Sequence, residues 1–340
     1  MANECIVDLP ESGAAVRLGE RFGRRFIVTV DTEEEFDWGR PLARTGHTLH
    51  SVPRLARFQS FCESFGVVPI YLIDYPVATC TEAAAALRDA VAAGRAEVGV
   101  QLHPWVSPPH DEDICEFNSF AGNLPEPLER AKLLHLRDAI ERNFGKPPLI
   151  YRAGRYGTGP HTAEILHDAG IAIDTSVRAR FDYSSTGGPN YRDFPVTPFW
   201  IGKPGRLLEL PLTTVYWGAL RRIGHWLYPR MWRVPRLRGA LARIGLFERI
   251  PLTPEGVTAK EAQRGIEAAI EDDLPLLVFS FHSPSLAPGH TPYVRTEADL
   301  DAFYDWWRDA FALLKRHNVA PTSVSEIMDK VVLATRRTPG

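Results

Sequence analysis

The sequence lacks the features that mark disulfide-stabilised, membrane-spanning and exported proteins. Its 340 residues include only four cysteines, without a CxxC pair or a metal-ligand spacing, so we expect reduced thiols. No run of about 18 apolar residues is present that could cross a bilayer. Residues 1–20 have no apolar core of signal-peptide length, and we expect residues 1–22 to form a leader on the surface. These absences predict a cytoplasmic protein.

Two further absences limit the ligands. The formal net charge of −3 gives no general attraction to nucleic acid, so we expect no nucleic-acid partner. No GxGxxG or Walker sequence follows the first predicted strand, which argues against a nucleotide site. There is also no internal repeat and no low-complexity linker. We therefore expect one domain over residues 23–335, and the sequence leaves the oligomeric state open.

Strand-like and helix-like segments alternate at least six times along the chain. Apolar runs predict strands at 26–30, 67–73, 97–102, 149–152, 171–174, 207–212 and 276–282. Helical patterns with start and stop signals fall at 53–65, 81–93, 126–144, 160–169, 258–271, 296–317 and 323–332. This alternation predicts a parallel α/β architecture. A single barrel or incomplete barrel of about seven strands fits the length, and a doubly wound open sheet is the alternative.

An acidic turn follows the first predicted strand. Residues 31–37 contain five carboxylates, which repel one another unless they are solvated or share a cation. Other polar clusters follow later strands, at 101–105, 151–157, 174–176 and 281–284. Strand ends of a parallel barrel converge on one face, so acid, imidazole and guanidinium groups would meet there. That combination suits metal-assisted hydrolysis of an amide or ester.

Each cluster also has an ordinary structural explanation. The acidic turn could be a solvated surface loop. His103 and His282, taken singly, are more often hydrogen-bonded structural histidines than ligands. Arg152 and Arg155 could simply anchor loops. The joint arrangement is what favours a functional site.

Five of these stretches, in this order, carry a family resemblance. They are residues 28–33, 97–103, 151–157, 170–176 and 279–283. Together they resemble the motifs of the polysaccharide deacetylases of carbohydrate esterase family 4, the NodB-homology group. The resemblance spans about residues 26–330. It implies a distorted (β/α) barrel and a hydrolase of carbon–nitrogen (non-peptide) bonds that removes N- or O-acetyl groups from glycans.

The resemblance also implies roles for individual residues. Asp31 matches the general base, His282 the general acid and Arg152 the partner of the base. Glu33 matches the metal carboxylate of a variant in which one residue separates the two acids, and His103 is the remaining imidazole of the second motif. The expected cofactor is a divalent metal, with zinc the first choice. Substrate contacts are expected from Gln101, Trp105, Arg155, Tyr156 and Trp38.

Two departures from the family pattern leave alternatives open. Thr32 replaces the usual second aspartate, so Asp31 could itself bind the metal while Glu33 or Glu34 takes the other role. Gln101 and Trp105 stand where the two metal histidines would be, and a neutral amide is a poor zinc ligand. The second hypothesis is therefore a degenerate protein that binds glycan or a partner without turnover. A third is a metal-free hydrolase of a non-sugar amide.

Residues 216–250 form a separate basic and aromatic stretch. Arginine alternates there with tryptophan, tyrosine and leucine, and Glu248 is its only acid. This composition predicts a helical insertion that lies on an anionic membrane surface, where a lipid-linked sugar would be a natural substrate. Alternatively, it could face another subunit, or form a helical hairpin packed on the barrel with a solvated basic face.

Overall fold

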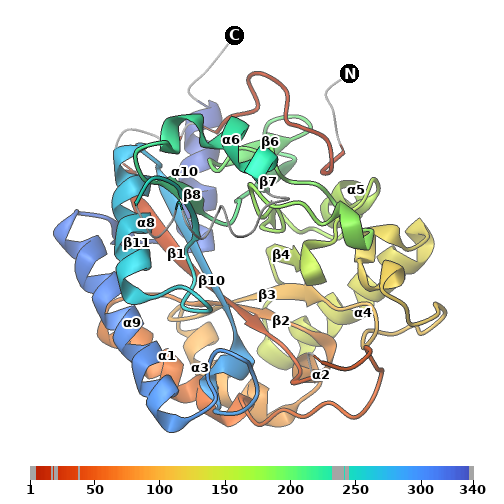
Figure 1. Cartoon of the computed structure of the whole chain (residues 1–340). Coiled ribbons are helices and arrows are strands. Elements are labelled where there is room, and N and C mark those ends of the chain that lie inside the picture. The colour runs from red at the N-terminus through yellow and green to blue at the C-terminus, as the bar shows by residue number, and fades with distance from the viewer. Residues whose placement is uncertain are drawn as a thin grey trace.

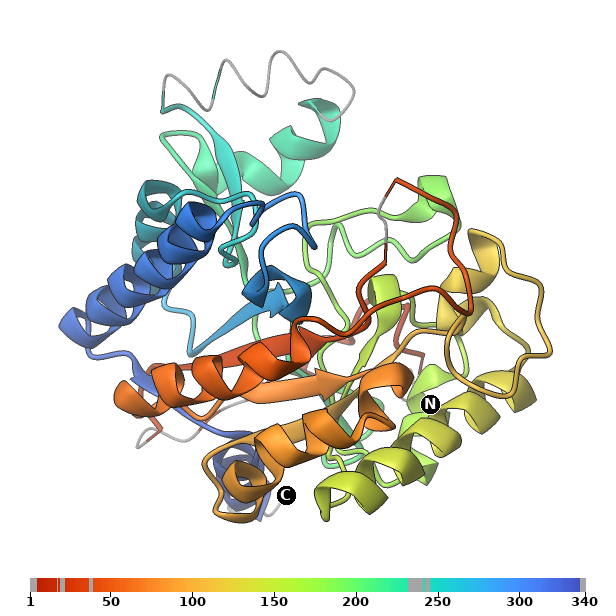
Figure 2. The same cartoon turned by 90° about the horizontal axis from the view of Figure 1, so that it is seen from below.

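The computed structural model describes residues 5–16, 18, 22–36, 39–231, 241 and 245–336. Seven parallel strands curl around a common axis (Figures 1 and 2), in the order β10-β1-β2-β3-β4-β5-β7. Their bounds are Arg25–Thr32 (β1), Ile70–Ile73 (β2), Glu97–Leu102 (β3), Ile150–Ala153 (β4), Ile173–Asp174 (β5), Leu207–Glu209 (β7) and Leu276–His282 (β10). The predicted distorted barrel of about seven parallel strands is confirmed, and the doubly wound sheet is not what forms.

The barrel is distorted where it closes. In the part of the chain that the structure describes, β7 and β10 form no regular ladder with each other, and Thr213 bridges the gap. Its backbone N–H donates to the Val278 carbonyl at 3.2 Å, and its Oγ1 accepts from the Val278 N–H at 2.8 Å. The cavity of the molecule opens beside this irregular seam, because Thr213 and Val278 both line it.

Four shorter strands were not predicted from the sequence. β6 (Phe199–Ile201) pairs antiparallel with β7, and β11 (Ala320–Pro321) lies beside β1. β8 (Thr214–Trp217) and β9 (Glu248–Pro251) form a separate antiparallel ribbon. Part of the expected leader packs on β6, because Ala15 pairs with Phe199.

Helices cover the outside of the barrel, as Figure 2 shows for the lower half of the molecule. The helices are Leu55–Ser64 (α1), Tyr75–Ala78 (α2), Thr81–Ala92 (α3), Glu126–Phe144 (α4), Thr162–Asp168 (α5), Gly224–Met231 (α6), Ala259–Glu271 (α8), Glu297–Arg316 (α9) and Val324–Arg336 (α10). The 3-10 turns are Val52–Arg54 (η1), Phe117–Ser119 (η2), Ala121–Asn123 (η3), Gly154–Tyr156 (η4), Ser184–Thr186 (η5), Arg221–Ile223 (η6) and Ser283–Leu286 (η7). All seven predicted helices are present within a few residues of their expected ends. The capping box predicted at Thr258 and Glu261 is confirmed.

Strand residues alternate between two apolar clusters. In β1, Val28 and Val30 pack outward with the surrounding helices, whereas Ile27 packs inside the barrel. The inner cluster continues through Leu72 and Val278 to residues of α10, which therefore plugs the N-terminal end of the barrel. The same alternation directs the polar residues at the other end of the strands into the barrel.

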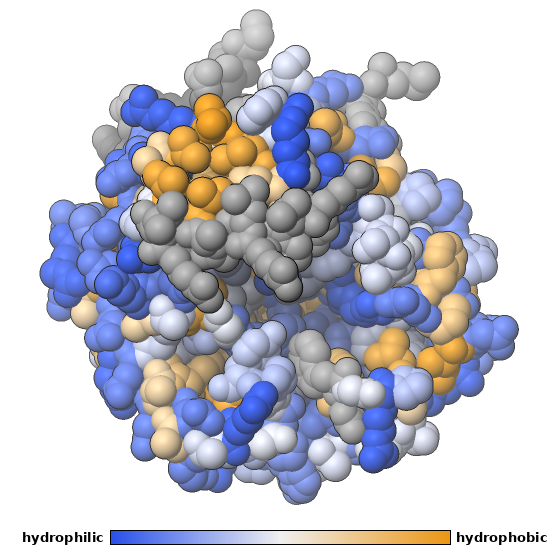
Figure 3. Space-filling view, viewed as in Figure 1, coloured by the Kyte–Doolittle hydropathy of each residue, from blue (hydrophilic) through white to orange (hydrophobic). Residues whose placement is uncertain are grey.

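The stretch 216–250 departs from the barrel through the β8–β9 ribbon, where Trp217 pairs with Glu248. Helix α6 lies within it, and residues 232–240 and 242–244 are outside the described part. Ile223 and Trp226 are 46% and 51% exposed. Figure 3 shows apolar side chains gathered over this region. None of the described helices is long and apolar enough to span a membrane, and the four cysteines are free thiols.

Candidate functional site

A cavity of about 640 Å³ opens at the C-terminal ends of the strands. The cavity is lined by most of the site residues predicted from the sequence. They are Asp31, Glu33, Gln101, His103, Trp105, Arg155, Tyr156 and His282. Arg152 is fully buried beneath them and reaches the cavity through Asp31. Trp38 lies outside the described residues. Four of the five predicted polar clusters therefore meet at this cavity, whereas the cluster at 174–176 does not line it.

The period of the strands explains this convergence. Asp31 follows Ile27 by four positions on β1, and His282 follows Val278 by four on β10, so both point inward like those apolar residues. The two strands are paired with Asp31 opposite His282. Gln101 on β3 and Arg152 on β4 are likewise register partners. Sequence spacing and sheet register together bring the four side chains to one floor.

Asp31 is held by Arg152. The Arg152 Nη1 group is ion-paired with Asp31 Oδ1, and both side chains are almost fully buried. The other guanidinium N–H groups donate to Thr29 Oγ1 at 2.8 Å and to the Thr175 carbonyl at 3.0 Å. Arg152 therefore supplies the opposite charge that a buried carboxylate needs and leaves Asp31 Oδ2 directed at the cavity.

His282 stands on the opposite side of Asp31 from Arg152. Its Nε2 lies 3.7 Å from Asp31 Oδ2, and its Nδ1–H donates to Glu255 Oε2 at 2.6 Å. Burial alone would lower the pKa of His282, but the charges of Glu255 and Glu33 raise it to about 10. Conversely, the pKa of Glu255 is lowered, because the charge of His282 outweighs the effect of burial. The pair thus presents an imidazolium N–H to the cavity.

Sequence reasoning missed Glu255. It follows β9, a short strand that was not predicted, and no apolar pattern or motif surrounds it. Its carboxylate also accepts the His282 backbone N–H at 3.1 Å and the Ser285 hydroxyl at 2.6 Å. Only the folding of the β8–β9 ribbon brings this acid next to β10.

Glu33, Gln101 and His103 form a second cluster on the cavity floor. Gln101 Nε2 lies 3.0 Å from Glu33 Oε2 and 3.3 Å from His103 Nε2, and the last two atoms are 3.4 Å apart. Burial raises the pKa of Glu33 to about 8 despite the nearby histidines His282 and His103. Within the described structure, the buried Gln101 Oε1 has no hydrogen-bond partner.

A set of contacts behind this cluster orients His103. Its Nδ1 lies 2.9 Å from Glu34 Oε2, and Trp105 Nε1 donates to Glu34 Oε1 at 2.8 Å. The Trp105 ring stacks on the imidazole with centroids 4.3 Å apart. A carboxylate that accepts from Nδ1 leaves the Nε2 lone pair free for a ligand, as behind metal-bound histidines. Glu34 therefore positions His103, a role that its side chain takes because it points away from the barrel interior.

Two groups of ligands around His103 can be compared as metal sites. Glu34, Asp74 and His103 offer ligand atoms within 4.8 Å of one another. Asp74, however, is occupied as the N-cap of α2, where it accepts from Val77 N at 2.9 Å, and from Glu34 N at 2.6 Å. Glu34 and Asp74 do not line the cavity, whereas Glu33 and the His103 Nε2 edge do.

The cavity-facing group fits a cation. Glu33 is a buried carboxylate whose pKa is raised by burial, and a bound cation would stabilise its charged form. His103 presents Nε2, and the Gln101 amide stands between the two. Because amide oxygen and nitrogen occupy equivalent places in either orientation, a flip of Gln101 would bring the unpartnered Oε1 to the same position. Carboxylate, imidazole and amide oxygen would then be three donors that a divalent metal can share.

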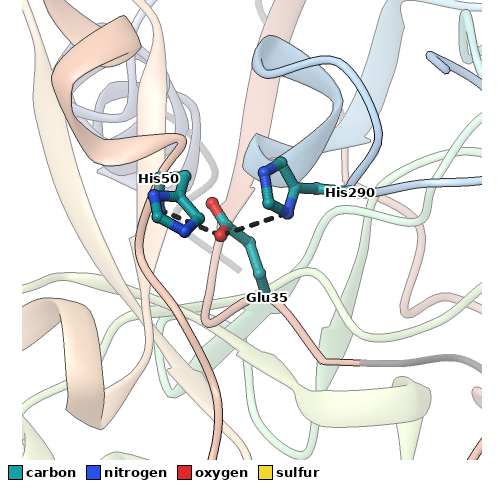
Figure 4. A group of neighbouring side chains, drawn as sticks. All are labelled: Glu35, His50 and His290. Atoms are coloured by element: carbon teal, nitrogen blue, oxygen red, sulfur yellow. Dashed lines mark hydrogen bonds and ion pairs between the residues drawn. The ribbon is translucent and has the colours of Figure 1, made fainter.

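A separate cluster lies on the outer side of the acidic turn. Glu35 Oε2 accepts from Thr48 Oγ1 at 2.6 Å and from His50 N at 2.9 Å, and it lies 3.3 Å from His290 Nδ1. Figure 4 shows the Glu35 carboxylate between the two histidines, whose ring centroids are 5.1 Å apart. Hydrogen bonds from Thr48, His50 and Ser51 outweigh burial and lower the pKa of Glu35. Glu35 thus ties two loops to the end of β1.

The turn after β4 shapes one wall of the cavity. Arg155 and Tyr156 have φ values of 55° and 62°, a left-handed conformation that is uncommon for residues other than glycine. The Arg155 guanidinium turns to the neighbouring loop, where it donates to Ser119 Oγ at 2.5 Å and pairs with Glu116 at 3.3 Å. Tyr156 stacks on Tyr183 with centroids 5.6 Å apart. The substrate contacts expected of Arg155 and Tyr156 stay predictions.

The comparisons with known proteins concern this fold. No protein-family model and no curated protein sequence matches the chain. A candidate polysaccharide deacetylase from Mycobacterium smegmatis matches with a TM-score of 0.51, 19% identity, and coverage of 98% of this chain and 97% of that one. A 4-α-glucanotransferase from Thermococcus litoralis matches with a TM-score of 0.51 and 15% identity, covering 91% of this chain and 40% of the other.

A third match is a CE4 family pseudoenzyme from Bacillus anthracis, with a TM-score of 0.42, 10% identity, and coverage of 91% and 66%. The chain has the polysaccharide deacetylase fold, as the motif resemblance implied. At these identities the matches concern the fold, and the chemistry has to be argued from the cavity itself.

Proposed function

We propose that the protein is a metal-dependent hydrolase that removes an acetyl group from a glycan. The observation that carries this proposal is the opposition of Asp31 Oδ2 and His282 Nε2 across 3.7 Å at the cavity floor. Arg152 is ion-paired with Asp31, and Glu255 stabilises the imidazolium form of His282. A base and an acid with opposite proton states, side by side, are the requirement for hydrolysis of an acyl bond.

Asp31 and His282 would each carry out one proton transfer of the reaction. Asp31 removes a proton from the attacking water as its oxygen bonds to the acetyl carbon. His282 gives its Nε2 proton to the amine or hydroxyl as the bond to the sugar breaks, and acetate leaves. Glu33 and His103, joined by the amide oxygen of Gln101, would hold a divalent metal. When bound, such an ion supplies Lewis-acid polarisation of the carbonyl and of water.

The wall residues support a sugar substrate. Trp105 and Tyr156 line the cavity with aromatic side chains, and Trp38 is a further predicted contact. A lipid-linked sugar at an anionic membrane surface is the form of substrate that we favour. The exposed Ile223 and Trp226 and the arginines of the 216–250 insertion support it, because such residues bind at membrane interfaces.

A second function is favoured by one specific contact. In the observed orientation, the Gln101 amide bridges Glu33 and His103, where a cation would otherwise lie. A protein that keeps this bridge would bind glycan without turnover. The variant Gln101→His separates the two functions. Tighter metal binding without any gain in acetate release would favour the binding protein, whereas higher activity would favour the hydrolase.

The test of the proposed function combines metal content and acetate release. We expect one divalent ion per chain after purification without chelator and titration with zinc. Acetylated chitooligosaccharides and acetylated xylan would report N- and O-deacetylation. His103→Ala should lose both the ion and the activity, while the control His110→Ala, which alters an exposed loop histidine, should retain both. A protein that binds no ion and releases no acetate would contradict the proposal.

A further inference from the structure

We propose that the cavity binds an acetylated sugar that carries an anionic group, a carboxylate or a phosphate, and that Arg178 binds this group. The inference rests on the proposed function, because it names the class of substrate for the same cavity. It concerns a side chain that the motif resemblance did not nominate. The observations that carry it are the position of Arg178, its neighbours and the pairing of the other charges in the cavity.

Arg178 lies in the loop after β5 and lines the same cavity as Asp31 and His282. Its guanidinium stands over the rings of Phe181 and Tyr156, at 4.0 Å and 5.1 Å from their centroids. Aromatic faces therefore hold the flat surfaces of the group. This arrangement fixes its orientation without any opposite charge.

The edge of the guanidinium has little to bind within the protein. Among the described residues, its one side-chain hydrogen bond runs from Nη1 to the Tyr183 hydroxyl at 3.1 Å. A guanidinium carries five N–H donors, arranged so that two can meet the two oxygens of a carboxylate or phosphate. Across the residues that the structure describes, no carboxylate is ion-paired with Arg178, and the donors that remain suit such a group.

Several other charged side chains of the cavity wall and floor each have a partner of opposite charge. In the same cavity, Asp31 is paired with Arg152, Glu255 with His282, and Arg155 with Glu116, each within 3.3 Å. Arg178 thus departs from a pattern of matched pairs. A guanidinium held among aromatic rings without a counter-charge is costly unless a partner arrives with the ligand. We infer that the substrate brings that partner.

The wall around Arg178 fits a charged substituent rather than the acetyl group itself. Tyr183 and Tyr293 also line the cavity, and their hydroxyls can donate to an anion. On the floor, in contrast, Asp31 is already paired with Arg152 and His282 with Glu255. The cavity therefore has a floor of paired charges for the chemistry and a basic, aromatic wall for recognition, which would orient the sugar along it.

Matched sugars test this inference by calorimetric titration. N-acetylmuramic acid carries a carboxylate, N-acetylglucosamine 1-phosphate carries a phosphate, and N-acetylglucosamine is neutral. We expect at least one charged sugar to bind about tenfold or more tightly than the neutral one. A preference for one over the other would assign the anion as carboxylate or phosphate. Inorganic phosphate alone shows whether the sugar is needed.

Arg178→Gln should remove the preference for the anion and leave the affinity for N-acetylglucosamine within about threefold, because only the charged contact is lost. Arg178→Lys should retain part of the preference, since it keeps the charge without the paired N–H groups. Arg130→Gln is the control, because Arg130 is an arginine of α4 that is paired with Glu126 and Asp168. The melting temperature of each variant shows whether it is folded.

The outcomes separate this inference from the proposed function. Equal affinity for charged and neutral sugars, or a preference that survives Arg178→Gln, would overturn the inference, even if acetate is released. A charged-sugar preference that depends on Arg178, without acetate release from any sugar, would support the anion site and contradict the hydrolase. If Arg178→Gln does not fold, the wild-type comparison and Arg178→Lys still decide.

Discussion

Single side chains behind the cavity floor determine what the floor can do. Glu34 and Glu255 each hold a histidine by its Nδ1 atom, at 2.9 Å and 2.6 Å. The consequences differ. Glu34 directs the Nε2 lone pair of His103 toward Glu33, as a metal ligand requires, whereas Glu255 stabilises the protonated form of His282, as an acid requires.

Replacing Glu34 should therefore weaken metal binding without removing a ligand. We expect Glu34→Gln to lower zinc affinity roughly 10- to 100-fold, because the amide no longer fixes the Nδ1–H tautomer of His103. Chelator competition against zinc measures this change. Glu267→Gln, a substitution of a half-buried residue of α8 that does not line the cavity, is the control and should leave zinc affinity as it is. An unchanged affinity in Glu34→Gln would mean that His103 is not a ligand.

Replacing Glu255 should instead change the pH dependence. The pKa of His282 is about 10 with Glu255 present, so the imidazole stays protonated through pH 8. In Glu255→Gln the pKa should fall toward the ordinary histidine value of about 6.5, and the deprotonated form would dominate at pH 8. Histidine NMR titration measures the pKa directly, and the alkaline limb of acetate release should move to lower pH.

Ser285→Ala is the control for this prediction. It removes the hydroxyl that donates to Glu255 at 2.6 Å but keeps the carboxylate charge, so the pKa of His282 should stay well above that in Glu255→Gln. If His282 has the same pKa in Glu255→Gln and in Ser285→Ala, the charge of the Glu255 carboxylate is not what raises that pKa.

At the scale of elements, segments with a local sequence signal were predicted and segments without one were not. The apolar run of β10 and the capping box of α8 placed both elements close to their observed bounds. β6 has three residues, and β8 and β9 are separated by thirty residues of arginine-rich chain, so no local period marks them. The site residues divide in the same way. Asp31 and His282 end apolar runs and were found, while Glu255 follows β9, which has no apolar pattern, and was missed.

Helix α4 offers a test of stability that is independent of the cavity. Glu129 in its first turn is buried and accepts from Thr162 Oγ1 at 2.5 Å, while its Oε2 is unpartnered in the described structure. Burial raises its pKa to about 7 from an ordinary 4.5. The folded state therefore holds the proton more tightly. This contribution is fully present below about pH 4.5 and is lost as the pH rises through 7.

We therefore expect Glu129→Gln to be nearly neutral at pH 5 and to stabilise the protein at pH 8.5 by roughly 2–3 kcal/mol, because the amide cannot ionise. Urea unfolding at the two pH values gives the two free energies. Glu126→Gln, at a more exposed position in the same helical turn, should show no such difference. A stability change of equal size at both pH values would contradict the raised pKa.

At the scale of the whole molecule, the two ends of the barrel differ in what they contain. Its N-terminal end is filled by the apolar inner cluster and plugged by α10, so it contributes stability. Its C-terminal end holds the polar floor, and the β8–β9 ribbon carries the 216–250 insertion away from this end of the barrel. Because the ribbon ends in the pair Trp217–Glu248, the insertion can be removed where its two ends already lie side by side.

Replacing residues 218–247 by an Asn-Gly turn should leave the barrel folded, since a two-residue loop closes an antiparallel ribbon. The cation–π contact of Arg264 over Trp217, at 4.2 Å, would anchor the shortened ribbon to α8. If the insertion docks on membranes, the deletion should abolish cosedimentation with phosphatidylglycerol vesicles. The intact protein should bind them and should not bind phosphatidylcholine vesicles, because arginines require the anionic headgroup. Equal binding by the deleted and intact proteins would contradict the membrane role and leave the proposal for the cavity unaffected, because Asp31, His282 and their partners lie outside the deleted stretch.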